Sequence, residues 1–289
     1  MVKVSILIGL LPAFGWGVQA LVMQKIGGKF TNKVMGMVLT TVLVAIVVYL
    51  FKPAHWSTNL IIGSILCGAF WSVGQILQVK SFDMVGVSMA MPISTGEQLF
   101  GAALIGAILF KEWTLGWQYW LGISALVLIV IGIVMTAYKE KGSAAGTNVK
   151  GGLIVLTISS IGFIGYATIP TWFHLDSWDV MLPQGISMLV CTMILVAFQK
   201  DNDMFGKKSW QNMLTGVFFA LANITVLFSN QLNGVAVGWT LSQMNVIVST
   251  LGGLWFLHEA RTHKEMKFTI IGLALVVIGA VMIGITRQS

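Results

Sequence analysis

The chain consists almost entirely of apolar runs that are about as long as a membrane-spanning helix. A helix needs roughly 20 apolar residues to cross the hydrocarbon core of a bilayer, and about ten segments meet that requirement. They are Val4–Met23, Val34–Phe51, Asn59–Val79, Gly86–Phe110, Gly116–Tyr138, Gly152–Trp172, Val180–Phe198, Gln211–Ser229, Val235–Leu257 and Phe268–Thr286. The first run is too long for a signal-peptide core and is expected to be the first span.

The composition agrees with lipid as the main solvent of this chain. Hydrophobic residues make up 56% of it and charged residues only 9%, with a mean hydropathy of +0.87. Soluble domains carry about 25% charged residues. The net charge of +7 is spread over short clusters between the apolar runs. We therefore expect a lipid bilayer as partner and no nucleic acid.

No motif for catalysis or metal binding stands out. Cys67 and Cys191 lie inside apolar runs and are expected to behave as small buried hydrophobes. The histidines are scattered over loops, and HExxH, P-loop and nucleophile-elbow patterns are missing from the sequence. The prediction is a protein that is not an enzyme and needs no cofactor, driven by a gradient or by the substrate's own concentration difference.

The two halves of the chain resemble each other. The stretch KVSILIGLLPAFGWGVQA aligns with KGGLIVLTISSIGFIGYA, and GAFWSVGQI aligns with GVFFALANI. Chance similarity among apolar helices is the alternative explanation. The preferred interpretation is a first repeat over residues 1–138, a Gly/Ala/Ser-rich linker over 139–151 and a second repeat over 152–289. The aligned pairs include Gly15 with Gly162, Trp16 with Phe163, Gln19 with Tyr166 and Gln75 with Asn223.

The distribution of positive charge predicts the orientation. If successive loops alternate between the two sides, Lys3, Lys52, Lys111 and Arg287 fall on one side, and the other 13 of the 17 Lys and Arg residues fall on the opposite side. The positive-inside rule then places both termini outside. Because each half has five spans, the halves insert with opposite orientations. The fold class expected is an all-α integral membrane protein, with about ten transmembrane helices as two inverted five-helix repeats.

Polar and aromatic residues recur at helical spacing on one face of several segments. Small residues and amides on such faces often only hold helices together. Taken as a set, they favour a cavity in which amides bind hydroxyl groups and aromatic rings cover an apolar sugar face. The predicted substrate-binding set is Trp16, Gln19, Trp71, Gln75, Ser94, Glu97, Gln98, Tyr166, Gln184, Asn223, Ser242, Gln243 and Asn245, and Gln78 and Trp239 share these faces.

Glu97 is unusual because it lies near the middle of the apolar run MPISTGEQLFGAALIGAILF. A charged carboxylate at the centre of a bilayer costs about 3 kcal/mol on insertion scales. We predict that Glu97 is a protonation site coupled to transport. The alternative is a protonated structural carboxyl that pairs with Gln98 or Gln75.

Five short motifs resemble those of the bacterial glucose/ribose uptake proteins, a sugar-transporter family within the drug/metabolite transporter superfamily. They are GWG, GQI, MPISTGEQL, LPQGISM and LSQMNVIVSTLGG, and MPISTG and SQM are closer to the glucose-type members. The resemblance implies ten helices as inverted repeats in the bacterial plasma membrane and proton-linked sugar uptake. It places motif amides and hydroxyls at Gln75, Ser94, Thr95, Gln98, Gln184, Ser242 and Gln243, whereas the acid at Glu97 departs from it.

The function predicted is alternating-access uptake of a monosaccharide with protons, glucose first and ribose second. An exporter of drugs, amino acids or other metabolites on the same scaffold is the alternative. An intramembrane enzyme lacks a catalytic set at mid-depth, and a channel would not need the duplication. The fifth and tenth spans could form a homodimer face, but their small residues Gly122, Gly132, Gly279 and Gly284 are equally expected in a monomer.

Overall fold

The computed structural model describes residues 2–85, 87–136, 138, 140, 149–200, 202–256 and 262–286, and nearly all of these residues are helical. The helices are α1 (Val2–Ile26), α2 (Phe30–Phe51), α3 (Thr58–Val85), α4 (Val87–Leu104), the π-helix η1 (Ile105–Leu109), α5 (Gly116–Thr136), α6 (Val149–Trp172), α7 (Met181–Ala197), α8 (Lys207–Asn233), α9 (Val235–Ser242), α10 (Asn245–Phe256) and α11 (His263–Thr286).

Each predicted segment is helical, which confirms the all-α membrane class. Seven helices, α1, α2, α3, α5, α6, α8 and α11, are long and apolar enough to cross a membrane. Some helices extend beyond the predicted ends. For example, α8 begins at Lys207, because backbone hydrogen bonding continues through a polar first turn that an apolar criterion leaves out. Most of the predicted linker, residues 139 and 141–148, lies outside the described residues.

The ninth predicted segment is not one continuous helix, and this part of the prediction was wrong. It divides into α9 and α10 at Gln243 and Met244. Around the break the amide of Val246 donates to the carbonyl of Gln243 at 3.3 Å, a bond over three residues rather than four. No Gly or Pro occupies the break, so the usual sequence signal for an interrupted helix is missing from it.

The fourth segment ends in the π-helix η1. Its wider turn is closed by the Phe110 amide, which donates to the carbonyl of Ile105 at 3.1 Å. The amide of Glu112 then returns to the carbonyl of Gly106, also at 3.1 Å. Single π-turns often re-aim the chain at functional sites. Here the turn carries the Glu112 side chain towards the start of α9.

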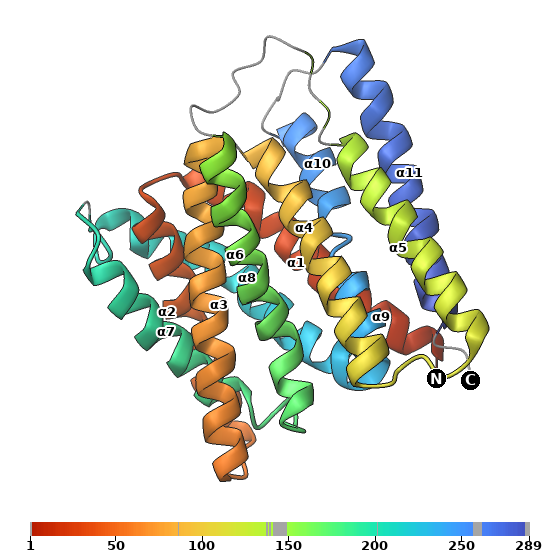
Figure 1. The fold of residues 1–289 in the computed structure, drawn as a ribbon. Helices are drawn as coiled ribbons and strands as arrows, with labels where there is room; N and C mark the ends of the chain where they lie inside the picture. The colour runs from red at the N-terminus through yellow and green to blue at the C-terminus, as the bar shows by residue number, and fades with distance from the viewer. Residues whose placement is uncertain are drawn as a thin grey trace.

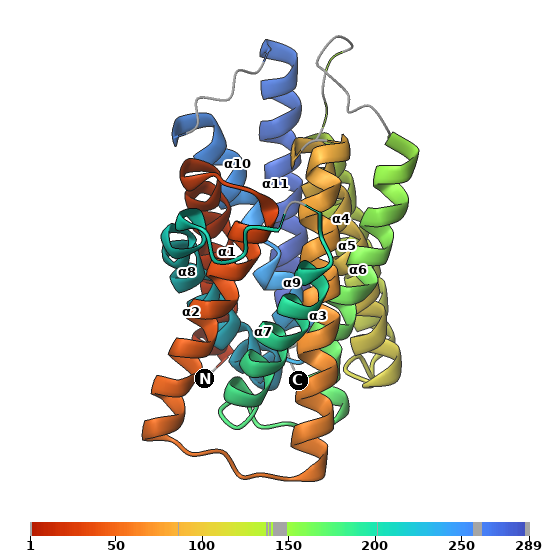
Figure 2. The same cartoon turned by 90° about the vertical axis from the view of Figure 1, so that its left-hand side faces the viewer.

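The helices form one bundle (Figure 1), and many polar side chains are buried inside it. α3 packs on α6, α1 packs on α8, and α4 and α9 lie between these pairs. α2 and α7 pack on each other and cover one flank, which is clear when the bundle is turned (Figure 2). α5 and α11 lie side by side at the opposite edge. α1 begins and α11 ends at the same end of the bundle.

Close approach of α5 and α11 depends on two glycines. A Cβ atom on either Gly132 or Gly272 would collide with the backbone carbonyl of the other. Two more of the small residues that could have formed a dimer face also pack within the chain, since Gly122 faces Trp113 and Gly279 faces Ile129. These contacts follow the rule that small residues let membrane helices approach closely.

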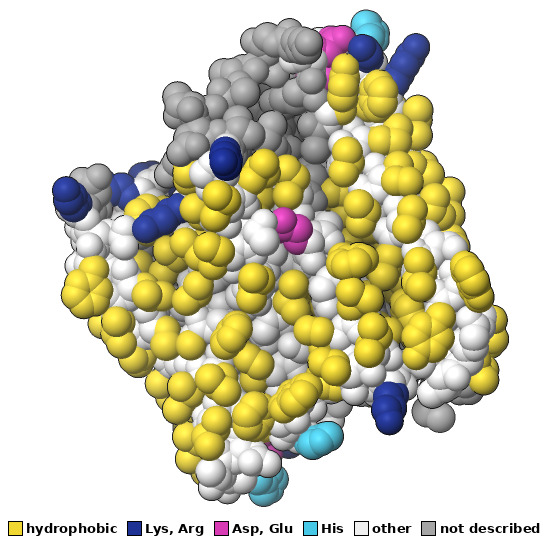
Figure 3. Space-filling view, viewed as in Figure 1, with side chains coloured by type: hydrophobic (Ala, Val, Ile, Leu, Met, Phe, Trp, Pro, Cys, Tyr) yellow, Lys and Arg dark blue, Asp and Glu magenta, His cyan; other side chains and the backbone are white. Residues whose placement is uncertain are grey.

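The outer surface of the bundle is apolar over most of its height. Large hydrophobic side chains are exposed on helices around the bundle, among them Leu50, Trp120, Val134, Ile161 and Leu221. Figure 3 shows hydrophobic side chains covering the middle of one face, with Lys and Arg side chains gathered towards the ends. In water such a surface would aggregate, whereas in lipid it is the required one. The protein is therefore a multi-pass membrane protein.

We expect Gly272→Ala to destabilise the α5–α11 pair. The added methyl group would meet the Gly132 carbonyl and the Thr136 backbone, and overpacking of this kind costs roughly 1–3 kcal/mol. Thermal unfolding in detergent measures the effect. Gly116→Ala, at a position with no atom within 4 Å of the added methyl, is the control and should unfold at or above the wild-type temperature. Equal unfolding temperatures for the two variants would contradict this packing.

Candidate functional site

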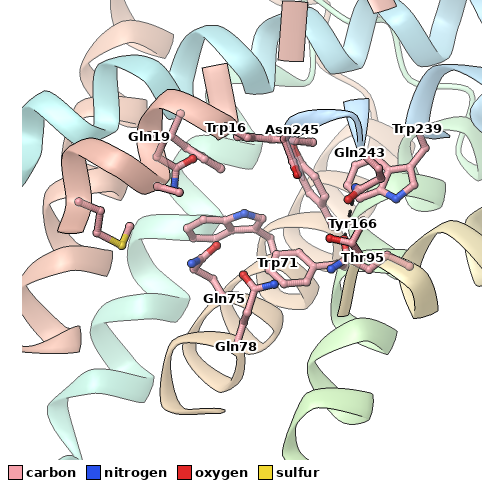
Figure 4. A pocket seen from close by; sticks show the side chains of 15 residues that line it. Trp16, Gln19, Trp71, Gln75, Gln78, Thr95, Tyr166, Trp239, Gln243 and Asn245 are labelled. Carbon is pink, nitrogen blue, oxygen red and sulfur yellow. Dashed lines mark hydrogen bonds between the residues drawn. The ribbon is translucent and has the colours of Figure 1, made fainter. Parts of the chain in front are cut away.

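A cavity of about 90 Å³ lies at the centre of the bundle, and we call it the central cavity. Its walls come from α1, α3, α4, α6, α8 and the α9–α10 break, so that both halves of the chain contribute. Figure 4 shows these side chains converging from α1, α3 and the α9–α10 segment. The lining residues are Trp16, Gln19, Ala20, Met23, Trp71, Gln75, Gln78, Thr95, Gln98, Phe163, Tyr166, Phe219, Trp239, Gln243 and Asn245.

The lining combines amides with large aromatic rings, and none of its residues carries a formal charge. Glutamine and asparagine side chains each offer both donors and an acceptor. The rings of Trp71 and Phe219 pack at 5.0 Å between centroids and form one wall. Among the described residues, no three His, Cys, Asp or Glu side chains come close enough together to hold a metal ion. The chemistry of the cavity therefore suits a neutral, hydroxyl-rich molecule.

A hydrogen-bonded network fixes the amides on one side of the central cavity. Gln98 donates to the hydroxyl of Ser94 at 2.8 Å, and Gln78 donates to the same hydroxyl at 3.1 Å. Gln243, at the helix break, reaches the side-chain oxygen of Gln98 at 3.5 Å. These bonds link α3, α4 and the α9–α10 break, so a ligand on one amide would affect all three elements.

Other polar atoms of the cavity have no partner within the described part of the chain. They are the indole nitrogens of Trp16 and Trp239 and the side-chain oxygen of Asn245. Trp239 is only 2% exposed and Asn245 only 7%. A buried polar group without a hydrogen bond costs free energy, and such groups are uncommon in native structures. Two donors and one acceptor are thus available to a ligand.

A second cavity of about 400 Å³ lies towards the end of the bundle where α1 begins, and we call it the end cavity. Tyr166 and Trp239 line both cavities and therefore lie between them. Their ring centroids are 5.6 Å apart in an edge-to-face arrangement, and Trp16 packs on Trp239 in the same way at 5.5 Å. These three rings form an aromatic barrier on one side of the central cavity.

Most of the predicted binding residues lie on the cavity wall, and a smaller group lies behind it. Those in the lining are Trp16, Gln19, Trp71, Gln75, Gln98, Tyr166, Gln243 and Asn245. Those outside the lining are Ser94, Glu97, Gln184, Asn223 and Ser242. Ser94 bonds to Gln98 and Asn223 to Tyr166, so these two support residues of the wall. Glu97 bonds to Thr157 and Ser160, Gln184 to Cys67, and Ser242 to the carbonyl of Trp239.

Glu97 points away from the central cavity, towards α6. Its two oxygens accept hydrogen bonds from Thr157 at 2.8 Å and from Ser160 at 2.7 Å. Thr157 is exposed on the outer surface, whereas Ser160 is buried. Figure 3 shows an acidic side chain at mid-height on the face formed by α4 and α6. The carboxyl group of Glu97 is thus partly exposed at the lipid-facing surface, and its partners among the described residues are the two hydroxyl groups of α6.

The lining also includes residues outside the predicted binding set. Gln78 and Trp239 shared the predicted polar faces, and Thr95 appeared only as a motif residue. Ala20, Met23 and Phe219 gave no signal, because an apolar residue that faces a cavity looks the same in sequence as one that faces lipid. Helical spacing from Gln75 could have placed Gln78 in the set.

Glu112 joins the end of η1 to the start of α9. Its two oxygens accept hydrogen bonds from the amides of Val235 and Ala236 at 2.7 and 2.8 Å. The carboxyl group fits against Gly234, where the backbone has φ +78 and an added Cβ would lie 2.6 Å from it. A carboxylate at a helix N-terminus is stabilised by the unpaired amides and the helix dipole. Glu112 therefore fixes the position of α9, the helix that carries Trp239.

Comparison with known proteins gives consistent matches over the whole chain. Residues 7–286 match the family described as sugar transport protein. A Listeria monocytogenes protein with the provisional name of a sugar uptake protein is 45% identical over 285 residues, covering 98% of this chain and 100% of that protein. The glucose uptake protein GlcU of Bacillus subtilis is 36% identical over 288 residues, covering 99% of each chain.

A solved structure supports the fold independently. The alignment of this chain with a solved crystal structure covers 97% of this chain and 96% of the other chain, with a TM-score of 0.75. The sequence identity is only 16%, so this likeness concerns the arrangement of the helices alone.

The carboxyl group of Glu112 gives a testable pH dependence. Burial raises its pKa above the ordinary value of 4.5, although the amides of Ala236 and Val235 lower it in part. Because the pKa is higher in the folded state, the folded protein binds this proton more tightly than the unfolded chain does. This contribution to stability is complete below pH 4.5 and is lost as the pH rises through the raised pKa.

We therefore expect the thermal unfolding temperature in detergent to fall more steeply above pH 4.5 in the wild type than in Glu112→Gln. Glutamine keeps an acceptor for one amide of α9 but does not titrate. The difference in unfolding temperature between the two proteins, followed as a function of pH, reports the titration of Glu112 separately from that of every other residue. A difference that stays constant with pH would contradict the raised pKa.

Proposed function

The chain belongs to the sugar transport protein family, and we propose that it is a secondary transporter that takes up glucose, with ribose as second candidate, through the central cavity. Relatives named for sugar and glucose uptake match nearly its full length, which supports this class of substrate and a bacterial membrane location. The observation that carries the proposal is the lining of the central cavity, which is uncharged, rich in amides and bounded by aromatic rings.

A neutral sugar needs hydrogen-bonding partners for its hydroxyl groups and a flat apolar surface for its C–H face. The amides of Gln75, Gln98 and Asn245 supply the first, and the indole of Trp71 supplies the second. The unpartnered atoms of Trp16, Trp239 and Asn245 match donors and acceptors of a polyol. A sugar that pairs these atoms would relieve a desolvation penalty that the unliganded protein carries.

The proposed architecture is two inverted repeats, residues 1–138 and 152–289, joined by the linker 139–151. Packing of the helices supports it, because α1 packs on α8 as α6 packs on α3. At the first contact a Cβ on Gly15 would lie 2.9 Å from the Phe218 carbonyl, and at the second a Cβ on Gly162 would lie 2.7 Å from that of Phe70. The alignment of the two halves pairs these same glycines and these same phenylalanines.

In the proposed orientation both termini and the end cavity face outside, as the Lys and Arg distribution predicts. The central cavity then lies near mid-depth at the interface of the repeats, as in other inverted-repeat transporters. Trp239 and Tyr166 close it on the outer side. Alternating access would part these rings to admit sugar from outside and restore them when the inner side opens.

Proton coupling remains part of the proposal, with Glu97 as the protonation site. A chain of side-chain contacts connects it with the central cavity. Ser160 donates to Glu97 at 2.7 Å, the hydroxyls of Ser160 and Ser94 are 3.4 Å apart, and Ser94 accepts from Gln98 at 2.8 Å. Occupation of the cavity could therefore alter the hydrogen bonds that Glu97 receives.

An exporter of drugs, amino acids or other metabolites is the second candidate. The uncharged lining disfavours cationic cargo, since no carboxylate faces the central cavity among the described residues. Counterflow of labelled glucose in proteoliposomes, with ribose and a cationic drug as competitors, separates the two functions. A glucose overshoot that the drug does not reduce supports sugar uptake. Exchange driven by the drug and not by glucose would establish the exporter.

We expect Asn245→Leu to raise the half-saturating glucose concentration for uptake about ten-fold. Loss of the acceptor for a sugar hydroxyl costs roughly 1–3 kcal/mol of binding free energy, and about 1.4 kcal/mol corresponds to a factor of ten in affinity. The side-chain oxygen of Asn245 has no hydrogen-bond partner among the described residues, so its removal should leave the thermal stability close to that of the wild type. Uptake into proteoliposomes measures the half-saturation.

Ser249→Ala, one turn further along α10, is the matched control. Among the described residues its hydroxyl bonds only to the carbonyl of Val246, and it does not line the central cavity. This variant should keep wild-type half-saturation. Unchanged uptake by both variants would rule Asn245 out as a sugar ligand.

For Glu97→Gln we predict that an inward proton gradient no longer stimulates glucose uptake, while counterflow without a gradient continues. Glutamine still accepts a hydrogen bond from Ser160 or Thr157 but cannot exchange a proton. Uptake with and without an imposed pH gradient gives the measurement. Thr157→Val removes the lipid-side hydrogen bond and keeps the acid, so its gradient dependence should persist. A gradient response retained by Glu97→Gln would exclude this residue as the coupling site.

A further inference from the structure

The end cavity has no role yet, although it is the larger of the two cavities. Its volume of about 400 Å³ falls in the range of small-molecule sites, whereas the central cavity of about 90 Å³ lies below that range. It is bounded by the last turns of α6 and α8, the end of η1 and the start of α9. Its lining residues are Phe110, Glu112, Tyr166, Ala167, Pro170, Thr171, His174, Leu175, Ser177, Val226, Leu227, Asn230, Gln231, Gly234 and Trp239.

The aromatic floor of the end cavity is shared with the central cavity. Tyr166 and Trp239 line both cavities, and Phe110 also lines the end cavity. Aromatic faces bind the C–H side of a sugar without distinguishing one ring from another. A molecule recognised on one side of this barrier therefore meets the same kind of surface on the other.

The polar groups of the end cavity are mainly neutral and belong to several elements. Thr171 on α6 has no side-chain hydrogen bond within the described residues, so its hydroxyl is available. Ser177 donates to the side-chain oxygen of Gln231 and can still accept a hydrogen bond. His174 projects from the end of α6 with an exposed side chain. Hydroxyl and amide groups thus surround a space above an aromatic floor.

Glu112 is the acidic residue of this lining. Each of its two oxygens accepts one amide hydrogen from α9, and an ionised carboxylate can accept about four hydrogen bonds in all. The start of α9 already compensates the charge, so the group does not require a cationic ligand. The remaining acceptor positions suit a pair of neighbouring hydroxyl groups. The other titratable groups of this lining are His174 and Tyr166, and Lys111 adjoins Glu112 in the chain.

We propose that the end cavity is a second binding site for the same monosaccharide, occupied before Trp239 and Tyr166 part to admit the sugar to the central cavity. This inference rests on the proposed function and deepens it. Sugar arriving from outside binds on the aromatic floor, with Glu112 and Ser177 taking its hydroxyl groups. Glu112 also holds α9 in place, so a sugar bound to this carboxyl group contacts the helix whose movement would carry Trp239 aside.

A thiol introduced by Thr171→Cys tests whether sugar enters the end cavity. Thr171 lines that cavity, and within the described part of the chain its side chain makes no hydrogen bond that the change would break. The rate at which a maleimide modifies the purified protein is measured with and without glucose. The unsubstituted chain, with buried Cys67 and partly buried Cys191, gives the background rate. Thr58→Cys, exposed at the start of α3 and outside the cavity, gives a control thiol.

The decisive comparison adds Asn245→Leu, which weakens the central cavity and does not touch the end cavity. We expect glucose to slow modification of the Thr171→Cys thiol about five-fold and to leave the Thr58→Cys thiol unaffected. The glucose concentration that gives half of this protection should be the same with and without Asn245→Leu. Absence of protection would overturn the proposal. So would protection that weakens about ten-fold with Asn245→Leu, because the effect would then come from the central cavity.

Uptake of labelled glucose by the same Thr171→Cys protein distinguishes a failure of the end-cavity proposal from a failure of the proposed transport function. Uptake without protection means that the chain transports glucose and that the end cavity is not a binding site. Absence of both uptake and protection in every variant, together with absence of uptake by the unsubstituted chain, would overturn the proposed function itself.

Discussion

In a bilayer every backbone amide and carbonyl must find a partner inside the protein, and this constraint decides where a helix can be interrupted. The chain interrupts its ninth apolar segment between α9 and α10, at Gln243 and Met244. Every residue from Val235 to Val246 is buried, so the break never meets lipid. The amides of Met244 and Val246 bond to carbonyls three residues before them, and the side chains of Gln243 and Asn245 line the central cavity.

The position of α9 depends in turn on a carboxyl group from the other half of the chain. Glu112 accepts both amides at the start of α9, and the glycine at 234 leaves room for it. With α9 fixed, Trp239 packs edge-to-face on Trp16 and Tyr166, and this barrier separates the two cavities. One charge-assisted contact outside the apolar core thus sets the shape of the binding region, which is why transport and stability should respond together to changes there.

Much of this arrangement follows from sequence, because lipid imposes a simple rule on each segment. Apolar length predicted the helices, and helical spacing of polar residues predicted which faces enclose the cavity. The break at Gln243 was not predictable, since tertiary hydrogen bonds stabilise it without Gly or Pro. The direction of Glu97 was equally hidden, because Thr157 and Ser160 that bind it come from α6, about 60 residues away in sequence. Spacing within one helix assigns a side chain to a face but cannot identify the partner across it.

A structure determined with saturating glucose is the most direct test of how this protein binds sugar. We expect a sugar in the central cavity, with its ring against Trp71 and its hydroxyl groups on the indole nitrogen of Trp239 and the side-chain oxygen of Asn245. The central cavity would then be larger than the present 90 Å³. A saturated protein whose central cavity holds no sugar, with Trp239 and Asn245 still unpartnered, would contradict this expectation.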